Sequence, residues 1–230
     1  MLEVKGLTKT YQSGSHELTV LDNVSFTIKL GDLCAVVGPS GSGKTTLLGL
    51  CAGLDSPTSG EVKLSGHTLN ECSEDQRAEI RRTTVGFVFQ TFKLIPTLTA
   101  LQNVMVPLEL NGHTSPKKSA MEILNEVGLK GREHHFPVQM SGGEQQRVGI
   151  ARAFIHRPKI LFADEPTGNL DTETGSRIED LLLNLNRTAN TALVVVTHDL
   201  KFAHQCHRVL ELDSGRIVRD HTNEAEATLD

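Results

Sequence analysis

The sequence predicts an α/β fold with an antiparallel β subdomain at its amino terminus and an inserted α-helical subdomain. Three kinds of pattern support this class: alternating apolar and polar stretches, continuous apolar runs, and helical periodicity. The alternating stretches, residues 2–10 and 24–29, lie on either side of a turn-rich QSGSH segment and favour antiparallel strands. The continuous apolar runs, at 33–37, 159–163 and 192–196, are typical of strands buried in a parallel sheet.

Helical patterns lie between the apolar runs and complete the alternation of an α/β core, at 44–52, 142–155 and 172–187. From Thr99 to Met140 β-branched runs are rare, and helix-like segments dominate, notably 99–110 and 116–127. We expect a single domain over residues 1–230 with a hinge near Gln90. Its parts would be a core with the β subdomain at 1–90 and 158–219, a helical subdomain at 91–157 and a short tail at 220–230.

Composition and charge argue against several classes of protein. The chain has 23 Lys and Arg against 28 Asp and Glu, a formal net charge of −5 and a pI near 6.1. Because binding to nucleic acid needs a cationic face, we do not expect nucleic acid as a partner. No run approaches the ~18 apolar residues of a membrane span, and the first residues lack the pattern of a secretory signal. A function at a membrane would therefore need a separate anchor.

The four cysteines are Cys34, Cys51, Cys72 and Cys206. They form no close pair and no metal-ligand spacing with histidine. We predict free, buried or half-buried thiols in a reducing compartment.

A glycine-rich loop follows the first apolar run and opens a helix. It reads GPSGSGKT from Gly38 to Thr45, which matches the phosphate-binding loop of P-loop NTPases. Its glycines let backbone N–H groups surround a phosphate, and the helix N-terminus adds partial positive charge. We expect Lys44 to reach the β- and γ-phosphates of ATP and Thr45 to ligate Mg²⁺. The predicted nucleotide-binding residues here are Gly38, Pro39, Ser40, Gly41, Ser42, Gly43, Lys44, Thr45 and Thr46.

Two acidic residues end a later apolar strand, ILFADE at 160–165. Asp164 would lie at the carboxyl edge of the sheet, where a carboxylate can hold Mg²⁺. Glu165 cannot point the same way and suits the role of general base for an attacking water, a role for which a kinase has no use. This pair favours ATP hydrolysis.

A second anion site is predicted at SGGEQQR, residues 141–147. The run opens a helix with small residues whose N–H groups are unpaired. Since one ATP needs only one phosphate-binding loop, we expect this run to contact the ATP held by another copy of the chain. The prediction is a homodimer that closes head to tail around two nucleotides.

The ordered motifs resemble the ATPase subunits of ABC transporters over essentially the whole chain. They are Tyr11, GPSGSGKT, Gln90, MSGGEQQR, ILFADEP, Asn169-Leu170-Asp171 and His198. The resemblance implies the ABC-ATPase fold with a RecA-like core, ATP and Mg²⁺ as cofactors, and a separate integral membrane permease as partner. It also implies a peripheral position on the cytoplasmic face of a bacterial inner membrane. Met140 stands where this signature usually has leucine, and Thr45 where serine is frequent.

The resemblance implies roles for individual residues. Tyr11 would stack on adenine, and Gln90 would contact Mg²⁺ or the attacking water and communicate with the permease. His198 would touch the γ-phosphate and steady the water with Glu165. The implied metal ligands are Thr45, Gln90 and Asp164.

At the second anion site the implied ligands of the partner's nucleotide are Ser141, Gly142, Gly143 and Glu144. Asp171 resembles an aspartate that contacts the partner chain, although it also suits the cap of a helix that begins at Thr172.

Three stretches resemble one branch of the family: FVFQTFKLIPTLTALQNV, SGGEQQRVGIARA and ADEPTGNLD. This branch contains LolD-type lipoprotein-releasing, MacB-type macrolide-efflux and YbbA-type ATPases, and residues 87–104 are most similar to the last type. The branch implies export through a separate permease. The alternative is an FtsE-type ATPase that transmits movement to cell-envelope enzymes and transports nothing. Soluble members in translation or DNA repair usually carry two cassettes or coiled-coil insertions, which this chain lacks.

The segment after Gln90, residues 91–101, carries more large apolar residues than an ordinary exposed loop. Its apolar side chains are Phe92, Leu94, Ile95 and Leu98. They either fold inward as the core of a hinge or form a groove for a short helix of the permease, and we expect the groove.

Overall fold

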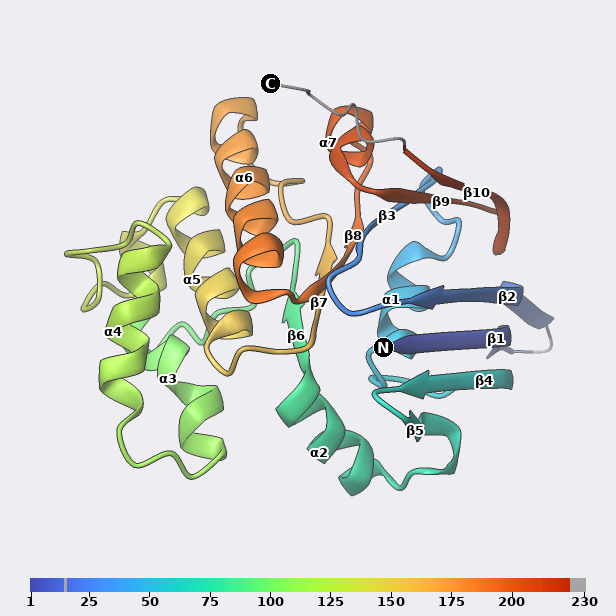
Figure 1. Ribbon diagram of the computed structural model, residues 1–230, viewed down its shortest axis with the longest axis horizontal. Helices are drawn as coiled ribbons and strands as arrows, with labels where there is room; N and C mark the ends of the chain where they lie inside the picture. Colours follow the sequence, from blue (N-terminus) through green and yellow to red (C-terminus); the bar gives the residue numbers. More distant parts are fainter. Residues whose placement is uncertain (15, 224–230) are drawn as a thin grey trace. The chain divides into compact units, whose positions relative to one another are not determined.

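The computed structural model describes residues 1–14 and 16–223, and backbone contacts group them into two compact units. Unit 1 contains residues 1–79 and the described residues from Ala192 onward, and unit 2 contains residues 80–191 (Figure 1). The expected helical subdomain at 91–157 falls within unit 2, and its boundaries stay a prediction. The predicted tail from 220 lies mostly outside the described residues.

Unit 1 begins with an antiparallel sheet in the order β2-β1-β4-β5. Its strands are β1 (Leu2–Ser13), β2 (His16–Ile28), β4 (Ser59–Leu64) and β5 (His67–Thr68). Leu2 and Val4 are buried on β1, as the alternating pattern predicts, and Leu7 is buried beyond a register shift in the pairing with β2. The two expected strands are confirmed, but β1 and β2 are longer than predicted and pair as far as Ser13 and His16. The described residues near these strand ends are mostly exposed, so no apolar alternation marks the extension.

The second set of strands in unit 1 lies side by side in the order β10-β9-β3-β8. These strands are β3 (Leu33–Val37), β8 (Ala192–Val196), β9 (Arg208–Asp213) and β10 (Arg216–Thr222). β3 runs parallel to β8 and β9, whereas β10 is antiparallel to β9. Every residue of β3 and β8 is buried, which confirms the continuous apolar runs as interior parallel strands. The remaining elements of unit 1 are α1 (Lys44–Cys51), η1 (Leu69–Glu71), α7 (Leu200–Gln205) and the first part of α2 (Glu74–Thr84).

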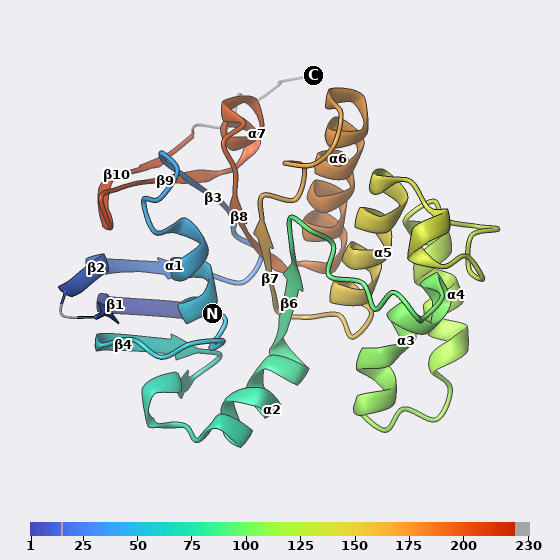
Figure 2. The same cartoon turned by 180° about the vertical axis from the view of Figure 1, so that it is seen from behind.

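Unit 2 combines a parallel strand pair with helices. The strands are β6 (Val85–Val88) and β7 (Ile160–Asp164), and the helices are α3 (Ala100–Leu110), α4 (Pro116–Glu126), η2 (Pro137–Gln139), α5 (Gly142–Phe154) and α6 (Thr172–Ala189). α5 packs against β6 and against the three other long helices. Figures 1 and 2 show α3 and α4 beside α5 from opposite sides. The predicted helices are confirmed to within a few residues at their ends.

The cysteines are free thiols, as predicted. Cys34, Cys51 and Cys206 are buried and Cys72 is half-buried. Burial raises the pKa of Cys34 to about 12. The thiolate form of this side chain is therefore scarce at neutral pH.

Within the part of the chain that the structure describes, none of the helices combines the length and the apolar character needed to cross a membrane.

Candidate functional site

The phosphate-binding loop of unit 1 connects β3 to α1 and surrounds the ammonium group of Lys44. Lys44 is 7% exposed, and its Nζ donates hydrogen bonds to the carbonyl oxygens of Gly38 at 2.9 Å and Pro39 at 2.8 Å. Neutral carbonyls compensate the charge of a buried ammonium less completely than an anion does. The loop therefore favours the binding of an anion beside Lys44.

Three features of the loop fit a phosphate. Gly38 has φ of 149° and Gly43 has φ of 100°, and an added Cβ would lie 2.0 Å from the carbonyl oxygen of Leu212 and 2.8 Å from that of Val20, respectively. The buried Oγ of Ser42 has no hydrogen-bond partner among the described residues. Gly43 is also the N-cap of α1, and no side chain caps this helix, so its N-terminus favours an anion.

Tyr11 lies on β1 and is 41% exposed. Its hydroxyl donates a hydrogen bond to Asp55 at 3.1 Å, and Lys9 Nζ lies 4.8 Å from the ring centroid and 2.8 Å from the same carboxylate. Partial burial raises the pKa of Asp55, but hydrogen bonds from Lys9, the N–H of Ser56 and Tyr11 outweigh it and hold that pKa below its usual value. These contacts fix the ring in place, and its exposed surface is compatible with the predicted stacking on adenine.

His198 follows β8 at the same edge of the strands as the phosphate-binding loop. β3 and β8 are parallel neighbours with Val36 opposite Val196, so the loops after both strands leave from one edge. Thr197 N–H also donates to the carbonyl oxygen of Val36 at 3.3 Å. His198 is exposed. Its contact with a γ-phosphate stays a prediction.

In unit 2 three predicted site residues gather at the carboxyl edge of the strand pair. Gln90 follows β6, Asp164 is the last residue of β7 and Glu165 follows it, and β7 pairs in parallel with β6. Glu165 has a positive φ of 45°, a conformation that is uncommon for residues other than glycine and recurs at functional sites. The backbone therefore leaves the extended conformation directly after Asp164, while the expectation that the two carboxylates point different ways stays a prediction.

The side chains of Gln90 and Glu165 both lie close to Gly168. A Cβ added at Gly168 would lie 2.8 Å from Gln90 Nε2 and 3.3 Å from Glu165 Oε2. The amide and the carboxylate therefore flank the same glycine, and any side chain at that position would displace them. This places a hydrogen-bonding amide beside the predicted general base.

The second predicted anion site is the N-terminus of α5, where Ser141 is the N-cap. Ser141 Oγ accepts a hydrogen bond from Glu144 N–H at 3.2 Å, and Glu144 Oε2 accepts one from Ser141 N–H at 2.8 Å. The expectation that these N–H groups are unpaired is thus only partly right, because the capping box satisfies two of them. Gln145 N–H is the first donor within α5, to the Ser141 carbonyl oxygen at 2.9 Å, so the N–H groups of Gly142 and Gly143 have no acceptor within the helix and are available to an anion.

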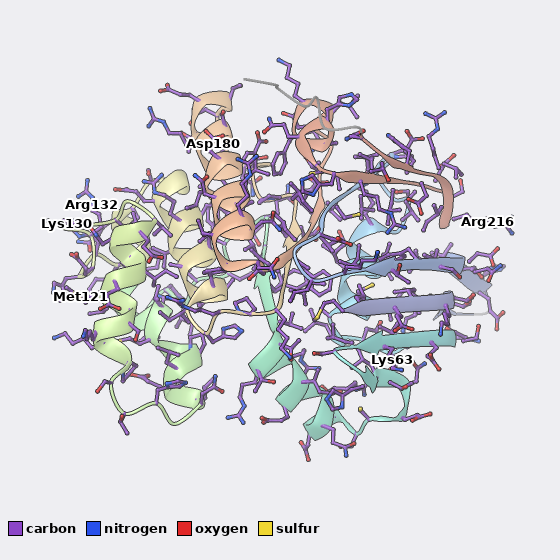
Figure 3. The ribbon with its side chains drawn as sticks, in the orientation of Figure 1. Lys63, Met121, Lys130, Arg132, Asp180 and Arg216 are labelled. Carbon is purple, nitrogen blue, oxygen red and sulfur yellow. The ribbon has the colours of Figure 1, made fainter. Side chains whose placement is uncertain are left out.

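Glu144 also binds a basic residue. Arg132, which Figure 3 labels in the loop after α4, has its Nε 2.8 Å from Glu144 Oε1. The hydrogen bond from Ser141 N–H, together with Arg132, lowers the pKa of Glu144. Glu144 is therefore ionised while it caps α5.

Asp171 caps α6. Its Oδ1 accepts a hydrogen bond from Thr174 N–H at 3.0 Å, which lowers the pKa of the exposed carboxylate. The capping interpretation of the sequence is thus confirmed, while contact with a partner chain stays a prediction.

Two further residues at this site had no predicted role. Asn169 Nδ2 donates to the carbonyl oxygen of Gln90 at 3.0 Å, and the buried Gln146 Nε2 donates to that of Pro166 at 2.6 Å. Both residues lie inside recognised motifs, and only this position in the sequence points to them. A hydrogen bond to the backbone carbonyl of a distant residue leaves no pattern in the local sequence.

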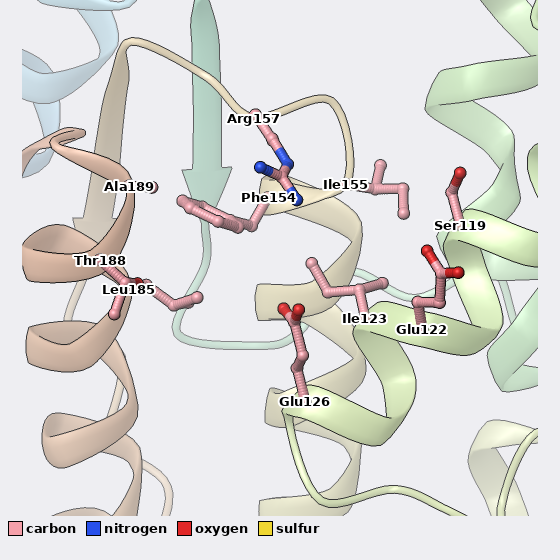
Figure 4. A pocket seen from close by; sticks show the side chains of 10 residues that line it. All are labelled: Ser119, Glu122, Ile123, Glu126, Phe154, Ile155, Arg157, Leu185, Thr188 and Ala189. Carbon is pink, nitrogen blue, oxygen red and sulfur yellow. The ribbon is translucent and has the colours of Figure 1, made fainter.

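A cavity of about 280 Å³ lies elsewhere in unit 2, beside the carboxyl ends of α5 and α6. Figure 4 shows apolar side chains such as Phe154 and Ile123 on its walls, with the charged groups of Glu122, Glu126 and Arg157 around them. None of its lining residues belongs to a predicted motif, so it is not the expected nucleotide site.

Comparisons with known proteins agree with the motifs. The ABC transporter family profile matches residues 21–168. The ABC transporter ATP-binding protein YbbA of Escherichia coli strain K12 is 52% identical over 222 residues, which cover 96% of this chain and 97% of YbbA. The lipoprotein-releasing system ATP-binding protein LolD of Legionella pneumophila strain Paris is 48% identical over 219 residues, which cover 94% of this chain and 96% of LolD.

A solved structure shows the same fold. It is the dimeric structure of a post-hydrolysis state of the ATP-binding cassette MJ0796 bound to ADP and Pi, with a TM-score of 0.91 and 42% sequence identity. The match covers 98% of this chain and 100% of the MJ0796 chain. The chain therefore belongs to the ABC transporter family, as an ATP-hydrolysing subunit with the ABC ATPase fold and a sequence of the branch that includes YbbA and LolD.

Proposed function

We propose that this chain uses ATP and Mg²⁺ to drive a separate membrane permease of the export type. The observation that carries the proposal is the pairing of a base with a hydrogen-bonding amide, since Glu165 and Gln90 both flank Gly168. Lys44 binds the β- and γ-phosphates in place of its present bonds to two carbonyls. Thr45, Asp164 and Gln90 would hold Mg²⁺, which supplies charge neutralisation for the phosphate oxygens.

Glu165 is the general base in this proposal. Its carboxylate takes a proton from the attacking water, and the amide of Gln90 orients that water. His198 contacts the γ-phosphate and keeps the water in line for attack. Tyr11 stacks on adenine and fixes the other end of the nucleotide.

The test is the substitution Glu165→Gln, which keeps the size of the side chain and removes its basicity. We expect phosphate release to fall by roughly 10²–10⁴-fold, the usual contribution of a general base, while ATP binding persists. The matched control is Glu173→Gln on the exposed face of α6, where Glu173 pairs with Arg177 at 2.6 Å. A Glu165→Gln chain that hydrolyses ATP at the wild-type rate would exclude Glu165 as the base.

Two copies of the chain form the working enzyme in this proposal. The MJ0796 cassette is dimeric in its solved structure, and the Gly142 and Gly143 N–H groups at the start of α5 provide a second anion site in each chain. Ser141 to Glu144 of one copy, with Asp171 nearby in sequence, would contact the nucleotide bound by the phosphate loop of the other copy. The uncleaved ATP of Glu165→Gln should then stabilise a dimer in gel filtration.

Mixing two inactive variants tests whether the site is shared. In a mixture of Lys44→Ala and Ser141→Arg chains, the mixed dimer has one intact site, built from the phosphate loop of the second variant and the α5 N-terminus of the first. We expect activity to return in the mixture. Full activity of Ser141→Arg by itself would refute the shared site.

The permease would dock beside Gln90 on the cytoplasmic face of a bacterial inner membrane. Ile95 in the following loop is 40% exposed, whereas Phe92, Leu94 and Leu98 are half-buried, so this loop offers apolar surface without being wholly solvent-exposed. Co-purification of the chain with a membrane fraction, and its loss in Ile95→Asp with ATPase activity retained, tests this part of the proposal. Normal co-purification of Ile95→Asp would place the docking surface elsewhere.

A further inference from the structure

The loop that follows Gln90 contains two consecutive residues in the left-handed backbone region. Phe92 has φ of 58° and Lys93 has φ of 48°. L-residues rarely adopt this conformation, because Cβ approaches the backbone carbonyl, and two in succession are more costly than one. Neither residue is glycine, so other interactions must offset this cost, and the local hydrogen bond from Phe92 N–H to the Phe89 carbonyl oxygen at 3.3 Å is one of them.

Arg152, in the last turn of α5, supplies such a contact. Its Nη1 donates to the carbonyl oxygen of Lys93 at 2.7 Å, and its Nη2 donates to that of Phe92 at 3.0 Å. The planar guanidinium thus binds two successive carbonyls at once, which a lysine ammonium cannot do with the same geometry. Burial lowers the pKa of Arg152, and no carboxylate is paired with it in the described part of the chain.

Phe92 also contacts the start and the middle of α5. Its ring carbon Cζ lies 3.7 Å from the position of a Cβ at Gly142, and its carbonyl oxygen lies 3.6 Å from that of a Cβ at Gly149. The spacing of residues 142, 149 and 152 puts them on one face of the helix. The loop is therefore fixed along the length of α5, the helix whose N-terminus is the second anion site.

Gln90 lies two residues before this contact. Its own carbonyl accepts the bond from Asn169, and its amide flanks Gly168 with Glu165. Further along the chain, the side chain of the fully buried Asn103 binds the backbone of Ile95 twice. Its Oδ1 accepts a hydrogen bond from Ile95 N–H, and its Nδ2 donates one to the Ile95 carbonyl oxygen. The left-handed pair lies between these two fixed points, and Arg152 is the charged residue whose side chain binds it.

We infer that Arg152 is a positioning residue for ATP hydrolysis, which holds the left-handed pair at 92–93 and thereby sets the Gln90 amide beside Glu165. This inference rests on the proposed function of Glu165 and Gln90. In the absence of the guanidinium the pair relaxes toward ordinary backbone angles and the loop loses its fixed position. Because the contact joins the Gln90 loop to α5, a movement of the second anion site is passed to Gln90 through Arg152.

The test uses Arg152→Lys, which keeps the charge but not the two-carbonyl geometry. We expect kcat to fall by roughly 10–100-fold, the scale of a catalytic group misplaced by about 1 Å, with KM and ATP affinity within about threefold of wild type. Backbone amide exchange over residues 91–95 should become at least tenfold faster. The matched control is Arg177→Lys on α6, whose exposed ion pair with Glu173 contributes little.

A rescue separates positioning from a general structural role. Lys93→Gly removes the Cβ that makes the left-handed conformation costly, so Arg152→Lys combined with Lys93→Gly should recover part of the lost kcat and slow the amide exchange again. If Arg152→Lys fails to fold, Lys93→Val, which makes the conformation more costly, should lower kcat with Arg152 intact. Wild-type exchange rates in Arg152→Lys, or the absence of rescue, would overturn the inference.

The exchange measurement does not depend on activity. If the wild-type chain proved unable to hydrolyse ATP, the proposed function would fail, while unchanged amide exchange in Arg152→Lys would refute the role of Arg152 by itself.

Discussion

The substitution Gly168→Ala tests the pairing of Gln90 with Glu165 without removing either side chain. Gly168 has no positive φ that requires glycine, so alanine is compatible with the backbone. Its Cβ would lie 2.8 Å from Gln90 Nε2 and 3.3 Å from Glu165 Oε2, whereas ordinary contacts are 3.4–4 Å. The amide must therefore move by at least about 0.6 Å, and the carboxylate hardly at all.

A displacement of this size has a calculable effect on hydrolysis. Misplacing a catalytic group by about 1 Å costs on the order of 10²-fold in rate. We therefore expect Gly168→Ala to lower kcat by roughly 10–100-fold, with ATP affinity within about threefold of wild type. The side-chain ends that must move are flexible, so the free energy of unfolding should change by less than about 1 kcal/mol.

The assay is phosphate release at saturating ATP, with ATP binding and urea unfolding measured on the same preparations. Gly49→Ala in α1 is the matched control, since an added Cβ there meets nothing within 4 Å. It should be active and, from helix propensity, more stable by roughly 0.5–1 kcal/mol. Wild-type turnover in Gly168→Ala would refute the view that the position of the Gln90 amide beside Glu165 limits hydrolysis.

Three further changes test other parts of the structure. Gly38→Ala should weaken ATP binding by at least roughly 100-fold, because its Cβ would lie 2.0 Å from a backbone oxygen of Leu212; near-normal affinity in a nucleotide titration would contradict the close approach. Ser141→Ala should lower the free energy of unfolding, measured by urea titration, by about 1 kcal/mol through loss of the cap. Ser141→Thr keeps a capping hydroxyl and should retain most of the wild-type stability. Asp220 accepts bonds from Arg208 at 2.7 and 2.6 Å, which lower its pKa. Its folded pKa is thus below its unfolded one, so the stability advantage over Asp220→Asn should be present at neutral pH and disappear as pH falls through the folded value. An advantage that persists in acid would contradict this assignment.

Much of the molecule could be predicted from the sequence because its signals are local. The run at 33–37 and the helix from Lys44 follow from periodicity over a few residues, and the spacing from Gly38 to Lys44 is short enough to fix the phosphate loop by itself. The same holds for the acidic end of β7. Family motifs added Gln90 and His198, whose surroundings resemble many ordinary strand ends.

Contacts between distant segments were decided only by the tertiary structure. Arg152 reaches carbonyls some sixty positions earlier in the chain, and Gly168 lies beside two side chains that follow different strands. The cap at Asp171 likewise needed the position of Thr174 N–H. Every residue has a backbone carbonyl, so a hydrogen bond to that carbonyl requires no particular residue type at the acceptor position. For that reason the sequence predicts the catalytic groups, while the residues that hold those groups in place appear only in the folded chain.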